Sequence, residues 1–269
     1  MQIVVTSDDG VHAPGLIALG RDLLGTFPNT VVAASVADCG GWGTSIRADG
    51  LQPINGRAVL PEPTPTRHHA LLAPPALIVL AACDGVFGPP PDVVVAGVNY
   101  GPNVGRAILH SGTIGAVLTA AVMGVRALAI SLDDVYSTGG REDGHMYWET
   151  ATAVAVPLIR WLAKAVPGTA LNVNVPNRRL RAVAGVRPAI PVPGSRRPML
   201  RLDQEQGRLF ECPGPHYNSS HEAAESDVAL LASGYITITP IGLLSPDTVA
   251  ASPAARWLEE DLALGSWTA

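Results

Sequence analysis

Apolar and polar positions along the chain follow two different periods, and this predicts alternating strands and helices. Short runs rich in Val, Ile and Ala, bounded by Gly, Pro or polar residues, are typical of buried strands. We expect strands over residues 3–5, 31–34, 92–95, 127–132, 172–175 and 235–239. Stretches with helical periodicity lie between them and predict helices over residues 15–24, 114–123 and 146–165. This alternation favours the α/β class, with a mostly parallel sheet that helices cover on both faces.

The periodicity weakens over residues 177–222, where Arg, Pro and Gly are frequent. We therefore expect an α/β core over residues 1–176 that carries the functional site, a projecting oligomerisation arm over 177–222, and a C-terminal strand and helix over 223–269 that complete the fold. An arm with little core of its own favours a homodimer or homotetramer, and the sequence leaves these two states open. The His68–His69 pair follows a Pro- and Thr-rich run and is interpreted as a surface loop.

Charge and cysteine content narrow the class of function. The chain has 269 residues and a formal net charge of −5, which gives no electrostatic reason to bind nucleic acid or an anionic membrane surface. We find no charge-free stretch long enough to span a bilayer. The three cysteines, Cys39, Cys83 and Cys212, are scattered, which favours a reducing, cytoplasmic location over a disulfide framework or a zinc site.

The first candidate site is the acidic turn that follows the first predicted strand. Asp8 and Asp9 stand just past the end of that strand, and in open α/β sheets ligands bind beyond the carboxyl ends of the strands. Two adjacent carboxylates repel each other unless a cation or a donor-rich loop compensates their charge, and Gly10 supplies a turn that can aim both at one point. The alternative is a plain turn with a helix N-cap, and this segment alone leaves both interpretations open.

A second polar cluster follows the strand predicted over residues 92–95. Asn99 offers a neutral oxygen to a hard cation such as Mg²⁺ or Mn²⁺. Ser111, Gly112 and Thr113 then open a helix, where free backbone N–H groups and the helix dipole favour an anion such as phosphate. Taken alone, this segment is also compatible with an ordinary Ser/Thr helix cap. Together with the aspartate pair on the same sheet edge, it favours a metal-assisted phosphoryl site.

Four ordered motifs carry a resemblance to a known family. The segments SDDGVHAPG, VAGVNYGPNVG, SGTIGA and SGYITITP, in this order and spacing, resemble the SurE family of survival-protein nucleotidases. The resemblance implies a Rossmann-like core, with an extended arm and a C-terminal segment exchanged between subunits. It also implies a divalent-metal-dependent phosphatase that releases phosphate from nucleoside monophosphates, with a small phosphorylated molecule rather than a nucleic acid polymer or membrane as its partner.

The resemblance also assigns roles to residues. It implies one Mg²⁺ or Mn²⁺ ion held by Asp8, Asp9 and Asn99, with the two aspartates also acting in catalysis. Asn103 matches a polar residue beside the site and is the third candidate catalytic residue. The phosphate-holding loop corresponds to Ser111, Gly112 and Thr113. Independently of the family, Trp42 lies among three glycines in a loop expected above the sheet edge, where an aromatic ring could stack on a base or plug the loop.

Several positions depart from the family pattern. Ser7 replaces an Asn, Ala76 replaces an acid, and Thr248 stands near the place of a histidine. The position of a serine metal ligand falls on Gly40, which has no side-chain oxygen, so the site would lose a ligand unless Asp38, Thr44, a backbone carbonyl or water replaces it. These changes keep two alternatives open: a SurE-like scaffold recruited to a specialised pathway with an altered substrate or a non-phosphatase hydrolysis, or a binding protein with a degenerate metal site. Asp227 matches a family acid and is expected to cap the next helix.

Overall fold

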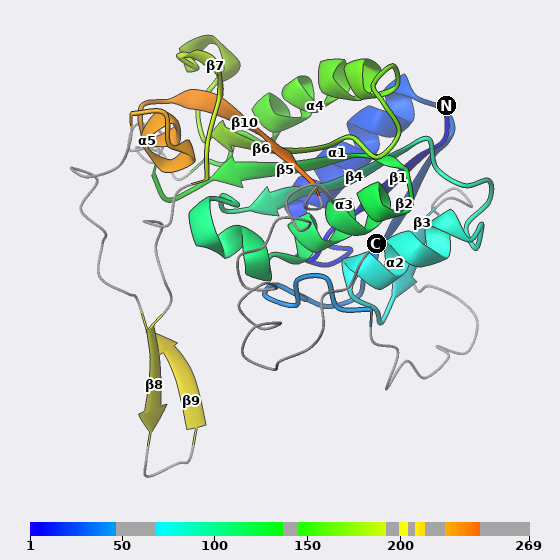
Figure 1. Ribbon diagram of the computed structural model, residues 1–269, viewed down its shortest axis with the longest axis horizontal. Coiled ribbons are helices and arrows are strands. Elements are labelled where there is room, and N and C mark those ends of the chain that lie inside the picture. Colours follow the sequence, from blue (N-terminus) through cyan, green and yellow to red (C-terminus); the bar gives the residue numbers. More distant parts are fainter. Residues whose placement is uncertain (47–67, 137–144, 192–198, 204–207, 213–223, 243–269) are drawn as a thin grey trace, which may run out of the picture.

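The computed structural model describes residues 1–46, 68–136, 145–191, 199–203, 208–212 and 224–242, and it confirms the predicted α/β class (Figure 1). Its main sheet has eight strands in the order β3-β2-β1-β4-β5-β6-β10-β7. These strands are β1 (Ile3–Thr6), β2 (Thr30–Ser35), β3 (His68–Leu71), β4 (Val93–Tyr100), β5 (Arg126–Asp133), β6 (Ala170–Pro176), β7 (Gly185–Pro188) and β10 (Tyr235–Ile241). The sheet is parallel from β3 to β6, and β10 joins β6 in the antiparallel sense.

Helices cover both faces of the sheet, as the alternating pattern predicts. Helices α1 (Pro14–Thr26) and α4 (Trp148–Leu162) pack together on one face, and α2 (Pro75–Cys83) and α3 (Gly112–Val122) pack together on the other (Figure 1). The short helix α5 (Asp227–Ala232) precedes β10, and the 3₁₀ helices η1 (Gly105–His110) and η2 (Leu180–Ala182) follow β4 and β6. Among the described residues, no helix is both long and apolar enough to cross a membrane.

Two elements differ from the pattern-based expectations. His68 and His69 lie in β3, which pairs in parallel with β2, and not in a surface loop. This expectation is wrong because pairing with a strand more than thirty residues earlier cannot be inferred from the Pro- and Thr-rich composition before the pair. Helix α2 is apolar on all sides, so it carries no amphipathic period that would predict a helix.

The segment expected as a projecting arm contains two kinds of structure. Strand β7 pairs with β10 at the edge of the main sheet. Strands β8 (Met199–Asp203) and β9 (Arg208–Cys212) pair only with each other as an antiparallel hairpin, which stands apart from the main sheet in Figure 1. Within residues 177–222, therefore, one part extends the sheet of the core and the other part forms a separate ribbon.

Candidate metal and phosphate site

The carboxyl ends of β1 and β4 bring the two predicted clusters to one edge of the sheet. The two strands pair in parallel up to Thr6 and Ala96. Asp8 and Asp9 follow β1, and Asn99 lies near the end of β4, so all three reach the same edge. The edge is therefore lined by carboxylate and amide oxygens, as the sequence predicts.

The turn after β1 is held by the neighbouring strand β2. Gly10 has a φ of +95°, a backbone conformation that favours glycine. The backbone N–H of Val11 donates to the carbonyl of Ser35 at 2.7 Å. The N–H of Cys39 donates to the carbonyl of Asp8 at 2.7 Å. The acidic turn is thus fixed by backbone bonds on both sides of the aspartate pair.

Asp8 is tied to the start of helix α3. Its Oδ2 accepts from the backbone N–H of Thr113 at 3.1 Å, and its Oδ1 accepts from the hydroxyl of Thr113 at 2.5 Å. The same hydroxyl lies 3.2 Å from Oδ1 of Asn99. A Cβ added to Gly112 would lie 2.9 Å from Asp8 Oδ2, so only glycine allows this close approach. Asp8, Asn99 and Thr113 therefore form one contact group.

Asp9 and Asn99 are oriented by the backbone after β4. The N–H of Tyr100 donates to Asp9 Oδ2 at 2.8 Å. Asn99 Nδ2 donates to the carbonyl of Gly101 at 2.7 Å, which leaves Asn99 Oδ1 on the side of Thr113. The Tyr100 amide is a contact that the sequence analysis does not predict, because a backbone donor has no signature in residue type.

Burial and neighbouring carboxylates raise the pKa of both aspartates. The pKa of Asp8 lies above its usual value chiefly because its carboxylate is desolvated, although the Thr113 hydrogen bonds act in the opposite direction. Desolvation raises the pKa of Asp9 to about 6, with further contributions from the charges of Asp8 and Asp38. A site that disfavours two carboxylate charges in this way gains free energy when a cation binds to it.

The residues present fit a hard divalent cation. Asp8, Asp9 and Asn99 supply only oxygen donors, the type that Mg²⁺ and Mn²⁺ prefer. Among the described residues, no three His, Cys, Asp or Glu side chains gather in a ready-made metal cluster. A site here would therefore combine two carboxylates with an amide oxygen and water, which suits Mg²⁺ because this ion retains several waters.

Asp38 lies beside the position where the family serine is replaced by glycine. Its Oδ1 accepts from the backbone N–H of Gly40 at 2.7 Å. A Cβ added to Gly40 would lie 3.0 Å from that same oxygen. The Asp38 carboxylate therefore lies next to the place where a side chain at position 40 would begin. Its charge reaches both Asp8 and Asp9, since it raises the pKa of each.

The predicted phosphate loop forms the start of α3. Ser111 is the N-cap, and its hydroxyl accepts from the N–H of Ile114 at 3.2 Å, so the plain helix-cap interpretation describes this side chain correctly. The cap does not account for Gly112 and Thr113, which contact Asp8 directly. The segment is thus both a helix cap and part of the acidic site.

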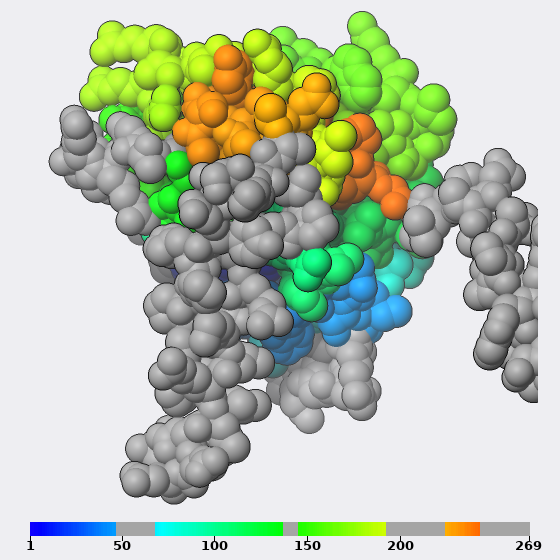
Figure 2. Space-filling model, turned by 60° about the vertical axis from the view of Figure 1, so that its left-hand side comes forward, coloured from blue at the N-terminus to red at the C-terminus, as the bar shows by residue number. Residues whose placement is uncertain are grey.

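Trp42 lies on the loop after β2, beside the site. The ring is 56% exposed. The next residue, Gly43, donates its N–H to the carbonyl of His110 at 3.0 Å, and a Cβ on Gly115 of α3 would collide with the Gly43 carbonyl. Figure 2 shows this loop, in blue, next to the blue-green surface that includes η1. The loop therefore packs on the start of α3 through Gly43, and its neighbour Trp42 is exposed.

Asn103 and Asp227 occupy interior positions. Asn103 is 5% exposed, and its Nδ2 donates to the hydroxyl of Ser131 at 2.9 Å. Asp227 was expected to cap the next helix, but Ser226 is the N-cap of α5, and Asp227 Oδ2 accepts from the N–H of Gly105. That expectation is wrong because the adjacent serine takes the capping position. The buried Asp227 carboxylate instead accepts a hydrogen bond from the distant loop that contains Gly105.

The other departures from the family pattern lie in different surroundings. Ser7 is buried, and its hydroxyl accepts from the N–H of Asp9 at 3.2 Å, so it supports the acidic turn. Ala76 is fully buried near the start of α2. Thr248 lies outside the described residues.

Fold and site together define a Rossmann-like α/β protein with an acidic, oxygen-lined site at the carboxyl edge of its sheet. The family model for survival protein SurE matches residues 3–195, and the chain belongs to this family. A protein from Cronobacter sakazakii named 5'/3'-nucleotidase SurE is 31% identical over 99% of this chain and 100% of its own. One of the same name from Escherichia fergusonii is 32% identical over 90% of each chain.

A solved structure shows the same likeness in three dimensions. The crystal structure of the SurE protein from Aquifex aeolicus matches with a TM-score of 0.76 and 25% identity, over 96% of this chain and 100% of its own. The family resemblance expected from the four motifs is therefore confirmed.

Proposed function

We propose that this protein is a metal-dependent phosphomonoesterase that releases phosphate from nucleoside monophosphates or a related phosphorylated metabolite. The single observation that carries the proposal is the contact group of Asp8, Asn99 and Thr113, in which a carboxylate and an amide oxygen meet the start of a helix. Family membership and the nucleotidase names of the relatives support the reaction class.

Three residues would hold one Mg²⁺ or Mn²⁺ ion: Asp8, Asp9 and Asn99. Such an ion, when bound, supplies Lewis-acid polarisation of a phosphoryl oxygen and lowers the pKa of water. Asp9 is the less buried of the two carboxylates, so we assign to it the acceptance of a proton from the attacking water. Asp8, which is 3% exposed, orients the start of α3 through Thr113.

The remaining site residues would bind and orient the substrate. The start of α3, from Ser111 to Thr113, offers the positive end of a helix dipole to the phosphoryl group, although the N–H of Thr113 already donates to Asp8. Trp42 presents an exposed ring beside this helix start, where a nucleobase could stack. Asn103, expected among the catalytic residues, is buried. It would contribute to the site indirectly, by holding in place the loop that follows Asn99.

Asp38 would assist the metal site in place of the missing serine through its charge and not as a third carboxylate ligand, because no three His, Cys, Asp or Glu side chains cluster among the described residues. Its carboxylate lies beside the Cβ position of residue 40 and its charge reaches both site aspartates. An Asp38→Ala variant should therefore bind Mn²⁺ more weakly, by about 10-fold or more, as measured by calorimetry. Unchanged affinity in this variant would remove Asp38 from the metal site without affecting the assignment of Asp8, Asp9 and Asn99.

The function is tested by phosphate release from a panel of 5'- and 3'-nucleoside monophosphates, with Mn²⁺ and with a chelator. We expect release from at least one nucleotide, loss of release with the chelator, and loss in Asp9→Asn. The exposed Asp84→Asn serves as the matched control, since it removes one carboxylate away from the sheet edge. Absence of release from every substrate, with no Mn²⁺ uptake by calorimetry, would contradict the proposal.

A specialised substrate is the second candidate, favoured by the replacement of a side chain at position 40 by glycine and of an acid by Ala76. In this case the nucleotide panel would be inactive, whereas Mn²⁺ would still bind and one other phosphorylated metabolite or ester would be hydrolysed. A binding protein with a degenerate site would show neither metal uptake nor hydrolysis.

We further propose a homodimer or homotetramer in the cytoplasm. The β8–β9 hairpin pairs only with itself among the described strands, which suits a segment that packs on a partner subunit. Cys39 and Cys83 are free, as expected in a reducing compartment. Light scattering coupled to size exclusion tests the oligomeric state, and a monomeric mass would contradict it.

A further inference from the structure

A row of buried polar side chains lies on the α3 side of β5, β6 and β10. Its members are all at most 3% exposed, and they are Ser131, Asn172, Asn174, Thr237 and Thr239. The residues that alternate with them on β6, Leu171, Val173 and Val175, enter the apolar core under α1 and α4. Buried polar groups destabilise a fold unless they are hydrogen-bonded. Among the described residues, Asn172 Oδ1 and the Thr237 hydroxyl have no such partner, whereas both amide groups of Asn174 are bonded.

The partner of the two asparagines is the backbone of one loop residue, Asn103. Asn174 Oδ1 accepts from the N–H of Asn103 at 2.7 Å, and Asn174 Nδ2 donates to the carbonyl of Asn103 at 3.0 Å. Asn172 Nδ2 donates to the same carbonyl at 2.8 Å. The amide of Asn174 thus satisfies both polar groups of one peptide residue, as a neighbouring strand would do.

Helix α5 holds the same loop two residues further along. Asp227 is fully buried, and its Oδ2 accepts from the N–H of Gly105 at 2.7 Å. Val104, between these anchors, is 2% exposed and packs with Val228 and Leu231 of α5. The loop between β4 and η1 is therefore docked by β6 and by α5.

This docked loop orients a proposed metal ligand. Asn99 Nδ2 donates to the carbonyl of Gly101, and this bond leaves Asn99 Oδ1 next to the Thr113 hydroxyl. Gly101 lies two residues before the clamped Asn103. The N–H of Gly101 also donates to the carbonyl of Leu132 at 3.0 Å, so a shift of the loop re-aims the Gly101 carbonyl without detaching the residue from β5, and this weakens the bond that orients the Asn99 amide.

We propose that Asn174 is a positioning residue for the metal and phosphate site: its amide fixes the loop at Asn103 and so aims the oxygen of Asn99. This inference rests on the proposed function, because it takes Asn99 as a metal ligand. Asn172 supports the same loop with a single hydrogen bond, so its contribution is smaller.

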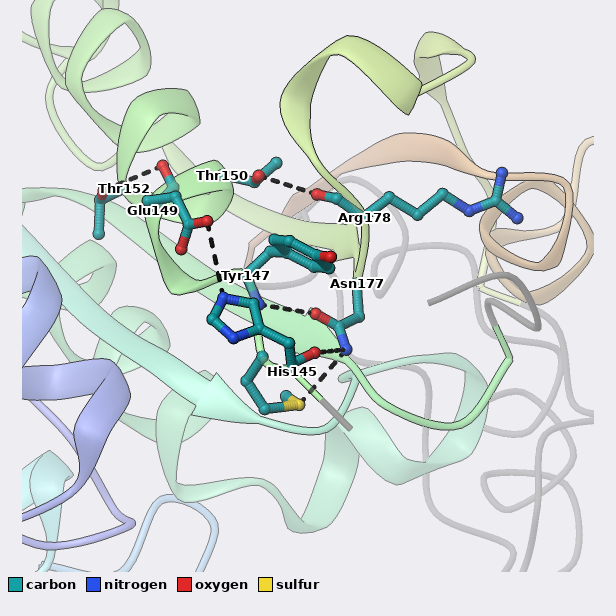
Figure 3. A network of polar contacts seen from close by, with 8 residues as sticks. His145, Tyr147, Glu149, Thr150, Thr152, Asn177 and Arg178 are labelled. Carbon is teal, nitrogen blue, oxygen red and sulfur yellow. Dashed lines mark hydrogen bonds and ion pairs between the residues drawn. The ribbon is translucent and has the colours of Figure 1, made fainter. Parts of the chain in front are cut away.

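The same device occurs a second time at the carboxyl end of β6. Asn177 Oδ1 accepts from the N–H of Tyr147 at 2.8 Å, and Asn177 Nδ2 donates to the carbonyl of His145 at 2.9 Å (Figure 3). Asn177 thereby holds the chain that leads into α4, away from the α3 side. Two amides near the end of one strand each clamp a backbone segment, but only the segment held by Asn174 leads to Asn99.

The test compares three substitutions within the buried row. Asn174→Leu removes both bonds to Asn103, Asn172→Leu removes one, and Thr239→Val removes a buried bond to Ala189 that does not involve the loop. Each variant is examined without metal by hydrogen exchange of residues 99–110 and by thermal unfolding, and then by Mn²⁺ calorimetry.

We expect graded effects on the loop and on Mn²⁺ affinity. Asn174→Leu should lose hydrogen-exchange protection in the loop and bind Mn²⁺ about 10- to 100-fold more weakly than wild type. Asn172→Leu should bind Mn²⁺ roughly fivefold more weakly. Thr239→Val should lower the melting temperature without either change. If Asn174→Leu does not fold, the test compares loop protection and Mn²⁺ affinity of Asn172→Leu with those of Thr239→Val.

Other outcomes separate the two proposals. Wild-type Mn²⁺ affinity in Asn174→Leu or Asn172→Leu, together with lost loop protection, would overturn the positioning role and leave the proposed function intact. Unchanged loop protection in both variants would also overturn it. No Mn²⁺ uptake by the wild-type protein would overturn the proposed function, and with it the assignment of Asn99 on which the positioning role depends.

Discussion

The two faces of the central strands β5 and β6 are built from different kinds of residue. On the side of α1 and α4, these strands present large apolar side chains: Leu128, Ile130, Leu132, Leu171, Val173 and Val175. On the side of α3 they present small or polar ones: Ala127, Ala129, Ser131, Ala170, Asn172 and Asn174. Large apolar residues stabilise by burial, whereas small residues let a helix approach closely and polar ones hold loops.

The difference separates stability from function within one sheet. On the α3 side, Gly112 contacts Asp8, Gly115 contacts the Gly43 carbonyl, and Asn174 holds Asn103. All three contacts bring backbone close to the proposed site. Substitutions at these three contacts should therefore affect activity more than stability, and substitutions on the α1 and α4 face should do the reverse.

The largest effect is expected from Asp8→Asn. This substitution keeps nearly the same side-chain shape but removes the charge of a proposed metal ligand. Phosphate release should fall by about 1,000-fold or more, since several kcal/mol of charge stabilisation depend on the bound cation. The melting temperature of the metal-free protein should not fall, because burial already disfavours the Asp8 charge, as its raised pKa indicates. Initial rates and thermal melts measure the two effects. Activity near that of wild type would exclude Asp8 from the site.

On the opposite face, Ile130→Ala should show the reverse pattern. Ile130 is fully buried, and the loss of its side chain leaves a cavity that costs about 2–5 kcal/mol of unfolding free energy. Denaturant unfolding measures this loss, while kcat well below the melting temperature should stay close to the wild-type value. A large fall in kcat of the folded variant would show that the two faces are not separable.

Gly112→Ala should reduce activity with little change in stability. The added Cβ would lie 2.9 Å from both Cβ and Oδ2 of Asp8, so the carboxylate or the start of α3 must shift. Displacement of a reacting group by about 1 Å lowers rates by about 100-fold. Gly25→Ala in α1 is the control, since its added Cβ meets no atom within 4 Å. Equal activity of both variants would contradict the close contact.

Thr113→Val should have a moderate effect, because it removes only the hydroxyl between Asp8 and Asn99. The loss of a hydrogen bond to a charged group corresponds to about 2 kcal/mol, or roughly 30-fold in Mn²⁺ affinity. Thr113→Ser keeps the hydroxyl and should retain most of the affinity in calorimetry. Equal losses in both variants would point to packing rather than to the hydroxyl.

A last effect, on stability and not on activity, concerns the pH dependence of folding without metal. Folding raises the pKa of Asp9 from 3.8 to about 6, so between these values the folded state binds more protons than the unfolded state. The contribution of this group to stability is therefore complete below pH 3.8 and is lost as the pH rises to about 6. Asp9→Asn should remove this loss, so its melting temperature relative to wild type should rise between pH 4 and 7. A constant difference over this range would contradict the raised pKa.

Local sequence patterns were sufficient for six strands of the main sheet and for the acidic turn, but not for β3 and β7. The runs around Val4 and Val94 are short, β-branched and ended by polar or glycine residues, so periodicity alone predicts them. The S-G-T segment carries its own helix-start signal, and Ser111 is indeed the N-cap of α3. The site residues adjacent to strand ends could be predicted because the ends of parallel strands meet at one edge.

Contacts between distant segments could not be predicted in this way. Asp227 resembles a helix cap by type, yet it bonds to Gly105, which is 122 positions away. Asn172 and Asn174 resemble interruptions in an apolar strand until the loop at Asn103 is placed upon them. Asp38 is a possible substitute ligand by sequence, but only the folded turn brings its carboxylate to the side of Gly40 and makes its charge act on Asp8.

The amino-acid order therefore specified the class of fold, the paired acids after β1 and the helix start that faces them, since each depends on neighbours within a few residues. The packed molecule decided which side of each strand is apolar, how the loop before η1 is held, and which oxygens meet at the sheet edge. The physical reason is that polar groups in the interior are stabilised by partners. In this chain the backbone of Asn103 finds its partners on β6, 71 positions away in the case of Asn174.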